Sequence, residues 1–155
     1  MEKNEKLKTV QMIYAGALAD MTLRMGNAGV LEQITKEKRE EQLSTGKARA
    51  MQMGIASPEE VFTKLSELMG CANWQIQKND ENGFAAVATG CALCSFAKRI
   101  GAPSPCDPFC LNPMEGMVNG LNPAAGFLVK ETLYEGKECR VQVSSRLHPT
   151  RPMPP

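Results

Sequence analysis

The chain has 155 residues, of which 43% are hydrophobic and 23% are charged, and its formal net charge is +1. These values fit one globular domain with a hydrophobic core. They exclude the strongly basic composition of nucleic-acid-binding proteins, and no apolar run reaches the length of a membrane span. The charged start of the chain, residues 1–6, does not predict a secretory signal, so we expect a cytoplasmic protein with reduced cysteines.

Three helices are predicted in the first half of the chain. In the first, over residues 7–25, helical spacing predicts one buried apolar stripe, which consists of Leu7, Val10, Tyr14, Ala17, Leu18, Met21 and Met25. A second helix is predicted over residues 28–53, with a polar, solvated middle at 36–42. The third begins at Ser57-Pro58-Glu59-Glu60, which combines an N-cap serine with proline at the first helical position, and Gly70 ends it.

Two β-hairpins are predicted in the second half. Residues 74–77 alternate in polarity, a turn follows at 79–83, and residues 84–89 form the returning strand. A short, glycine-interrupted helix is predicted over 112–125. The second hairpin comprises a strand over 127–134, a turn at Glu135-Gly136 and a last strand whose inward face carries Cys139, Val141 and Val143.

This order of elements predicts an α+β fold in which the N-terminal helices pack on an antiparallel sheet of two hairpins. Residues 1–145 are expected to form one domain that includes a cysteine-rich metal loop. The proline-rich tail, residues 146–155, is expected to be disordered.

Four cysteines lie within twenty residues, in a C-x₂-C, eleven-residue, C-x₃-C pattern: Cys91, Cys94, Cys106 and Cys110. The connection between the pairs contains Gly101, Pro103 and Pro105, which favour turns. Two thiol pairs joined in this way can converge on one tetrahedral metal, and the pattern predicts zinc ahead of an iron–sulfur cluster. Buried structural thiols and a redox dithiol at Cys91 and Cys94 are the two alternatives.

The remaining candidate residues give weaker signals. Cys71 and Cys139 are expected to be small buried core residues. Asp107 and Glu131 are the carboxylates that could serve as a general base, although Asp107 before Pro108 is also typical of a turn. His148, the single histidine, lies in the tail and is not expected to be catalytic.

The chain contains ten methionines, and their flexible side chains could line an adaptable apolar pocket. Ordinary core filling is the alternative. If a pocket exists, we expect it between the Met-rich helices and the 127–143 hairpin, next to the cysteine loop and large enough for a small ring compound.

Three segments carry a family resemblance: Cys106-Asp107-Pro108-Phe109-Cys110, Gly120-Leu121-Asn122-Pro123, and the stretch ETLYEGKEC over residues 131–139. Together they resemble the L-2-amino-thiazoline-4-carboxylic acid hydrolase-like family, which is similar to 4-vinyl reductase-type small-molecule-binding domains. The resemblance covers about residues 89–143. It implies helices on an antiparallel sheet with cysteines near a ligand pocket. By position, the residues that match the family are Cys91, Cys106, Cys139, Thr132 and Gly136.

We therefore expect a cysteine-ligated metal beside a small-molecule pocket. If the site is catalytic, the reaction is metal-assisted hydrolysis of a small ring at a C–N or C–S bond, with Asp107 or Glu131 as base. A four-cysteine site is closed, which argues against catalysis. Two alternatives are a non-enzymatic ligand, metal or redox sensor, and a helix-mediated interaction module that forms a homodimer.

Overall fold

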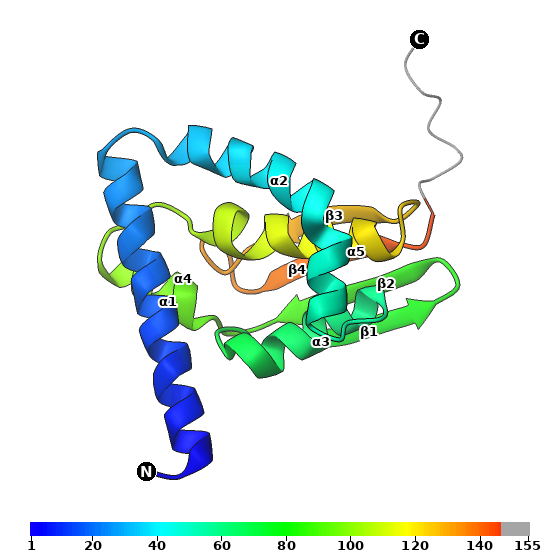
Figure 1. Ribbon diagram of the computed structural model, residues 1–155, viewed down its shortest axis with the longest axis horizontal. Coiled ribbons are helices and arrows are strands. Elements are labelled where there is room, and N and C mark those ends of the chain that lie inside the picture. Colours follow the sequence, from blue (N-terminus) through cyan, green and yellow to red (C-terminus); the bar gives the residue numbers. More distant parts are fainter. Residues whose placement is uncertain (147–155) are drawn as a thin grey trace.

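A computed structural model describes residues 1–146 of the chain (Figure 1). The predicted α+β class is confirmed, and no described helix is long and apolar enough to cross a bilayer. His148 and the rest of the predicted tail after Arg146 lie outside the described residues. The elements, with η1 a short π-helical segment, are α1 (Lys3–Asn27), α2 (Leu31–Gln52), α3 (Pro58–Met69), β1 (Gln75–Asp80), β2 (Gly83–Ala88), α4 (Ala92–Arg99), η1 (Asp107–Leu111), α5 (Asn112–Leu121), β3 (Gly126–Glu131) and β4 (Cys139–Ser144).

The four strands form one antiparallel sheet in the order β1-β2-β4-β3. Each predicted hairpin supplies two neighbouring strands, and β2 pairs with β4 to join them, with Phe84 opposite Val143 and Ala88 opposite Cys139. From Phe84 to Ala88 every position of β2 is buried, as expected for a short apolar central strand. In β4 burial alternates, so Cys139 faces the core as its position predicts.

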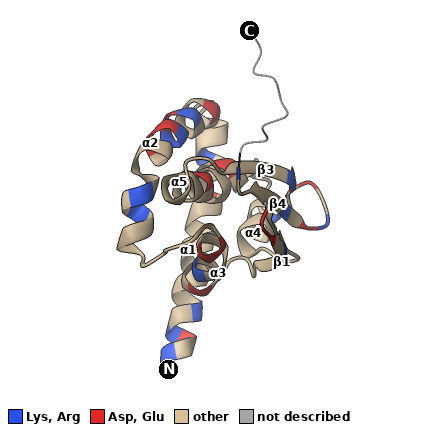
Figure 2. Ribbon diagram, turned by 90° about the vertical axis from the view of Figure 1, so that its right-hand side faces the viewer, with Lys and Arg blue, Asp and Glu red and all other residues tan. Residues whose placement is uncertain are grey.

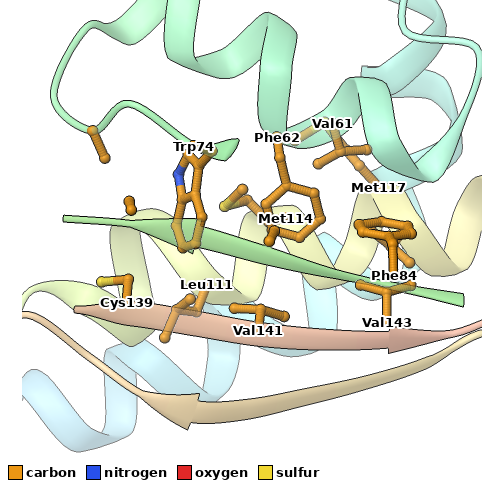
Figure 3. Close-up of a cluster of buried hydrophobic side chains, with 14 of the residues drawn as sticks. Val61, Phe62, Trp74, Phe84, Leu111, Met114, Met117, Cys139, Val141 and Val143 are labelled. Atoms are coloured by element: carbon orange, nitrogen blue, oxygen red, sulfur yellow. The ribbon is translucent and has the colours of Figure 1, made fainter. Parts of the chain in front are cut away.

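Phe62 of α3 lies at the centre of the larger core cluster (Figure 3). Its ring makes edge contacts with Trp74 and Phe84 at centroid distances of 5.3 and 5.7 Å, and it stacks on Phe127 at 6.2 Å. Each such aromatic pair contributes about 0.5–1.5 kcal/mol beyond the area it buries. The cluster therefore fixes α3 on the sheet.

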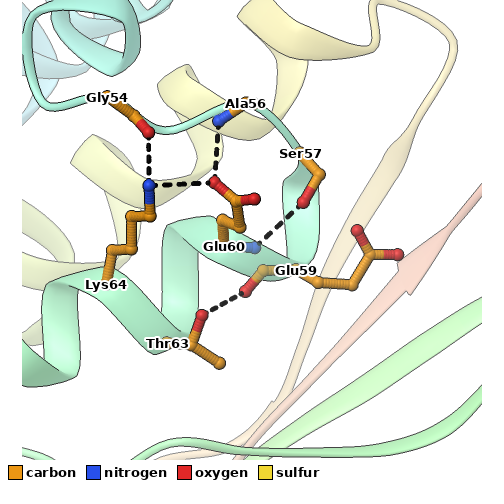
Figure 4. A network of polar contacts seen from close by, with 7 residues as sticks. All are labelled: Gly54, Ala56, Ser57, Glu59, Glu60, Thr63 and Lys64. Atoms are coloured by element: carbon orange, nitrogen blue, oxygen red, sulfur yellow. Dashed lines mark hydrogen bonds and ion pairs between the residues drawn. The ribbon is translucent and has the colours of Figure 1, made fainter.

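The predicted start and end of α3 are both present, and Figure 4 shows the contacts at the start. Ser57 accepts a hydrogen bond from the Glu60 backbone N–H, and the Glu60 carboxylate accepts one from the Ala56 N–H while pairing with Lys64. Gly70 ends the helix in the left-handed conformation, with φ of 63°. The helix thus stops where the chain must turn, and Cys71 follows directly.

Helices α2 and α5 approach each other closely at three glycines. A Cβ atom added to Gly46 would overlap the Gly116 carbonyl, and one added to Gly116 would overlap the Gln42 carbonyl. A Cβ atom at Gly120 would overlap the Lys47 backbone in the same way. The glycines of the predicted interrupted helix therefore allow close backbone contact, and α5 remains helical through them.

The predicted single buried stripe of α1 is wrong. The helix buries a different set of residues, Ala15, Leu18, Ala19 and Thr22, and these include only one member of the predicted stripe. Ala15 and Ala19 pack with Leu93 and Ala97 of α4 in the smaller core cluster. The face of α1 that is buried depends on the position of α4, a helix within the cysteine segment that the turn-rich pattern did not predict.

Helix α2 carries charges of both signs along its length (Figure 2). Most of its predicted solvated middle is exposed, but Gln42 is 5% exposed and is an exception to that prediction. Gln42 is buried because its segment of α2 faces α5 at the glycine contact.

Candidate functional site

Cys91 and Cys94 lie at the start of α4. Cys91 is the N-cap residue, and its sulfur accepts a hydrogen bond from the Cys94 backbone N–H at 3.4 Å. The following turn brings Cys106 back, so that the Cys94 and Cys106 sulfurs lie 3.5 Å apart. The structure thus brings three of the four predicted ligands together.

Cys71 joins this group from the end of α3. The Ala92 N–H donates to the Cys71 carbonyl at 2.7 Å, and Ala72 forms an isolated antiparallel bridge with Cys91. The Cys71 side chain is near enough to be the largest influence on the pKa of Cys91, which it lowers. The sequence predicts Cys71 to be a small buried core residue, because only a long-range backbone contact brings it to the other cysteines. We call Cys71, Cys91, Cys94 and Cys106 the thiol cluster.

Within the thiol cluster, two cysteines favour the thiolate form and the other two favour the protonated thiol. Hydrogen bonds from the thiols of Cys71 and Cys94 lower the pKa of Cys91 to about 3. A hydrogen bond from Cys94 likewise lowers the pKa of Cys106. The same contacts raise the pKa values of the two donors, Cys71 and Cys94. Thiolate is the form that binds metals and attacks electrophiles, so Cys91 and Cys106 are the reactive members.

The other two cysteines lie outside the cluster. The Cys110 thiol donates to the Met114 sulfur at 3.8 Å, and burial raises its pKa well above the ordinary value. Cys139 is buried in the core, where its sulfur accepts a hydrogen bond from the Leu133 N–H at 3.2 Å. Burial raises the pKa of Cys139 to about 11. Both thiols are therefore protonated at neutral pH.

One pair of sulfurs, Cys94 and Cys106, has a separation close to that of two ligands of a tetrahedral metal. Two thiolates bound to one zinc at about 2.3 Å lie about 3.8 Å apart, close to the 3.5 Å between Cys94 and Cys106. Across residues 1–146, no group of three or more His, Cys, Asp or Glu side chains is already arranged to hold a metal ion. Binding by the whole cluster would therefore require some of its side chains to rotate.

A mostly apolar pocket of about 160 Å³ adjoins the cluster, and Cys71 contributes to its wall. A cavity of about 150 Å³ can hold benzene, so the volume suits one small ring. Four methionines line it, but no residue of the 127–143 hairpin does, so that part of the predicted position is wrong. The lining side chains belong mainly to helices, and they include Leu18, Met53, Met69, Trp74, Phe109, Cys110, Met114 and Met117.

Besides Tyr14, the pocket wall contains an amide and two charged side chains that give it its chemical character. Gln42 lines it, and its buried Oε1 atom has no hydrogen-bond partner within the described residues. The charged side chains that line it are Lys38 and Arg49. An unpartnered buried acceptor is costly, so a ligand that donates to Gln42 would relieve that cost. Because the Oε1 atom is fully buried, the amide must first turn toward the pocket. The two cations favour a ligand that also carries negative charge.

The predicted carboxylates lie elsewhere. Asp107 is exposed and lines a separate, open depression beside α2. Glu131 lies at the end of β3, where its Oε1 accepts a hydrogen bond from the Lys137 N–H at 3.2 Å. Neither lines the pocket that adjoins the thiol cluster.

Comparisons of the chain with protein-family models, with curated proteins and with solved structures gave no match.

The lowered pKa of Cys91 can be tested in metal-free protein. An ordinary thiol, with a pKa of about 8.5, is almost fully protonated at pH 6. A group with a pKa of about 3 stays ionised above that pH, so the Cys91 thiolate should persist as the pH falls from 8 to 5. The difference in ultraviolet thiolate absorbance between the wild-type protein and Cys91→Ala is therefore expected to stay constant over this pH range. Cys110→Ala, which removes a protonated thiol, is the control and should lose no thiolate absorbance. If the absorbance difference between the wild-type protein and Cys91→Ala titrates near pH 8.5, the assigned pKa of Cys91 is wrong.

Proposed function

We propose that this protein binds a thiophilic metal ion, zinc in the first instance, through its thiol cluster, beside a pocket for a small ligand. The observation that carries the proposal is the 3.5 Å contact between the Cys94 and Cys106 sulfurs. The Cys91 sulfur caps the same helix, and backbone pairing holds Cys71 beside Cys91. Four sulfur donors favour zinc or an iron–sulfur cluster over harder cations. Two members already favour the thiolate form that metal binding requires.

The contacts favour Cys71 over Cys110 as the fourth ligand. Backbone pairing holds Cys71 beside Cys91, whose pKa it lowers, whereas the Cys110 thiol donates to Met114. Of the four metal ligands predicted from the sequence, the proposal therefore keeps Cys91, Cys94 and Cys106 and replaces Cys110 with Cys71. Cys110 remains at the pocket wall, where a bound ligand would contact it.

The pocket favours ligand binding over hydrolysis. Ring hydrolysis needs a general base within hydrogen-bond reach of the attacking water. Both proposed bases, Asp107 and Glu131, lie away from the pocket, and no carboxylate lines it within the described residues. A site with four thiolate ligands is also closed to water. We therefore favour a ligand- or metal-responsive sensor over the hydrolase that the family resemblance implies.

The polar groups of the pocket define the ligand class. The ligand is a small planar ring with an N–H donor for Gln42 and an anionic group near Lys38 and Arg49. Pyrrole-2-carboxylate has both features. Furan-2-carboxylate has the same shape and charge but lacks the donor, so the two compounds form a matched pair.

Gln42→Leu is expected to separate stability from binding. The substitution removes an unpartnered buried acceptor, so the free energy of unfolding should rise by about 1–2 kcal/mol in denaturant titration. The wild-type protein should bind pyrrole-2-carboxylate about tenfold more tightly than furan-2-carboxylate by calorimetry. The variant should bind both equally. Equal binding by the wild-type protein, or a preserved preference in the variant, would count against the assigned role of Gln42.

A further inference from the structure

Helix α1 has an apolar face that neither core cluster covers. At three- and four-residue spacing, Leu7, Val10, Tyr14, Ala17 and Met21 are all exposed. Ile13, beside them, is 66% exposed and Val10 is 62% exposed. The spacing is that of the a and d positions of a coiled coil. We call these six residues the α1 seam.

Most of the α1 seam is exposed, while Tyr14 at its edge borders the ligand pocket. By the helical period of 3.6 residues, Ile13 lies on the opposite side of the helix from the buried Ala15, and Tyr14 lies beside the buried Leu18. The N-terminal half of α1 projects past the body of the molecule (Figure 1). The Gln11 side chain ties this half to the end of α3 by donating to the carbonyls of Glu67 and Leu68. A projecting helical segment of this length is marginal alone, because isolated helices shorter than about 12–15 residues are barely stable in water.

We propose that the α1 seam binds the α1 seam of a second copy in an antiparallel coiled coil. Charge complementarity carries the choice of partner and direction. With Ile13 against the partner's Ile13 on the two-fold axis, heptad geometry sets Lys6 opposite the partner's Asp20, and the symmetry repeats this pair. Asp20 also pairs with Arg24 of its own helix at 2.9 Å, so Lys6 would join an existing ion pair. The same register sets Leu7 against the partner's Ala17 and Val10 against the partner's Tyr14.

A parallel pair has no such complementarity. It would set Lys6 beside the partner's Gln11, an uncharged side chain that already donates to the end of α3. The antiparallel arrangement instead places each projecting N-terminal half beside the partner's C-terminal half. Tyr14 belongs to both the seam and the wall of the ligand pocket, so the partner would cover that edge of the pocket.

The dimer is tested by sedimentation equilibrium of the full chain and its variants. The wild-type protein should be a dimer at micromolar concentration. Ile13→Glu, which opposes two like charges on the axis, should raise the dimer dissociation constant at least about tenfold. The control is Met12→Glu, a change at a residue that is 40% exposed but lies off the seam, and it should leave the constant unchanged.

Charge exchange tests the direction of the helices. Lys6→Glu should weaken the dimer by setting like charges together, and Lys6→Glu combined with Asp20→Lys should restore it. A monomeric wild-type protein would overturn the proposal. So would a dimer that the double variant fails to restore, or a monomer that uses this face to bind anionic lipid vesicles.

Discussion

Gly116→Ala is expected to destabilise the protein by about 3 kcal/mol, at the upper end of the range for overpacking. The added methyl group would overlap the Gln42 carbonyl of α2, which is backbone and cannot rotate away. The helices would have to separate, and their separation would disturb Met114 and Met117 in the core. Urea unfolding followed by circular dichroism measures the change.

Gly16→Ala is the matched control within α1. No atom lies within 4 Å of an added methyl group at Gly16. Because alanine is the better helix former by about 1 kcal/mol, this variant should be as stable as the wild-type protein or more so. A Gly116→Ala protein of wild-type stability would mean that α2 and α5 are not in backbone contact.

Cys94→Ser is expected to abolish stoichiometric metal binding. Cys94 lies between Cys91 and Cys106 in the thiol cluster, so its loss removes the central ligand. A hydroxyl is a poor substitute for a thiolate at a thiophilic ion. Cys71→Ser should have the same effect, whereas Cys110→Ser should retain the metal. Elemental analysis of protein purified without oxygen provides the metal-to-chain ratio.

Cys139→Ser controls for the loss of a buried thiol. Its sulfur bonds to the Leu133 N–H outside the cluster, so this variant should keep its metal even if it is less stable. If Cys110→Ser loses the metal and Cys71→Ser keeps it, the sequence-based ligand set is correct and the assignment of Cys71 is wrong.

The fold could be predicted where local signals act alone. Ser57, Pro58 and Gly70 delimit α3 through hydrogen bonds and backbone conformations within their own segment. The alternation of Cys139, Val141 and Val143 assigns the inward face of β4 for the same reason. Clustering of Cys91, Cys94 and Cys106 follows from their spacing along the chain.

The remaining features depend on contacts between distant segments. Cys71 reaches the thiol cluster through backbone pairing with residues 91 and 92. Gln42 is buried because glycines more than seventy residues away let α5 approach α2. The apolar residues of α1 show that the helix is amphipathic. They do not show which face meets the body of the protein, because that depends on where α4 packs against the helix. Helical periodicity contains no information about such partners.

X-ray absorption spectroscopy of the purified metal-bound protein tests the central claim most directly. With the metal identified by elemental analysis, the proposal predicts about one zinc per chain, surrounded by four sulfur atoms at about 2.3 Å. Cys71→Ser should lose this signal. Protein purified without oxygen that contains no stoichiometric metal, or a metal bound through nitrogen or oxygen, would contradict the proposal.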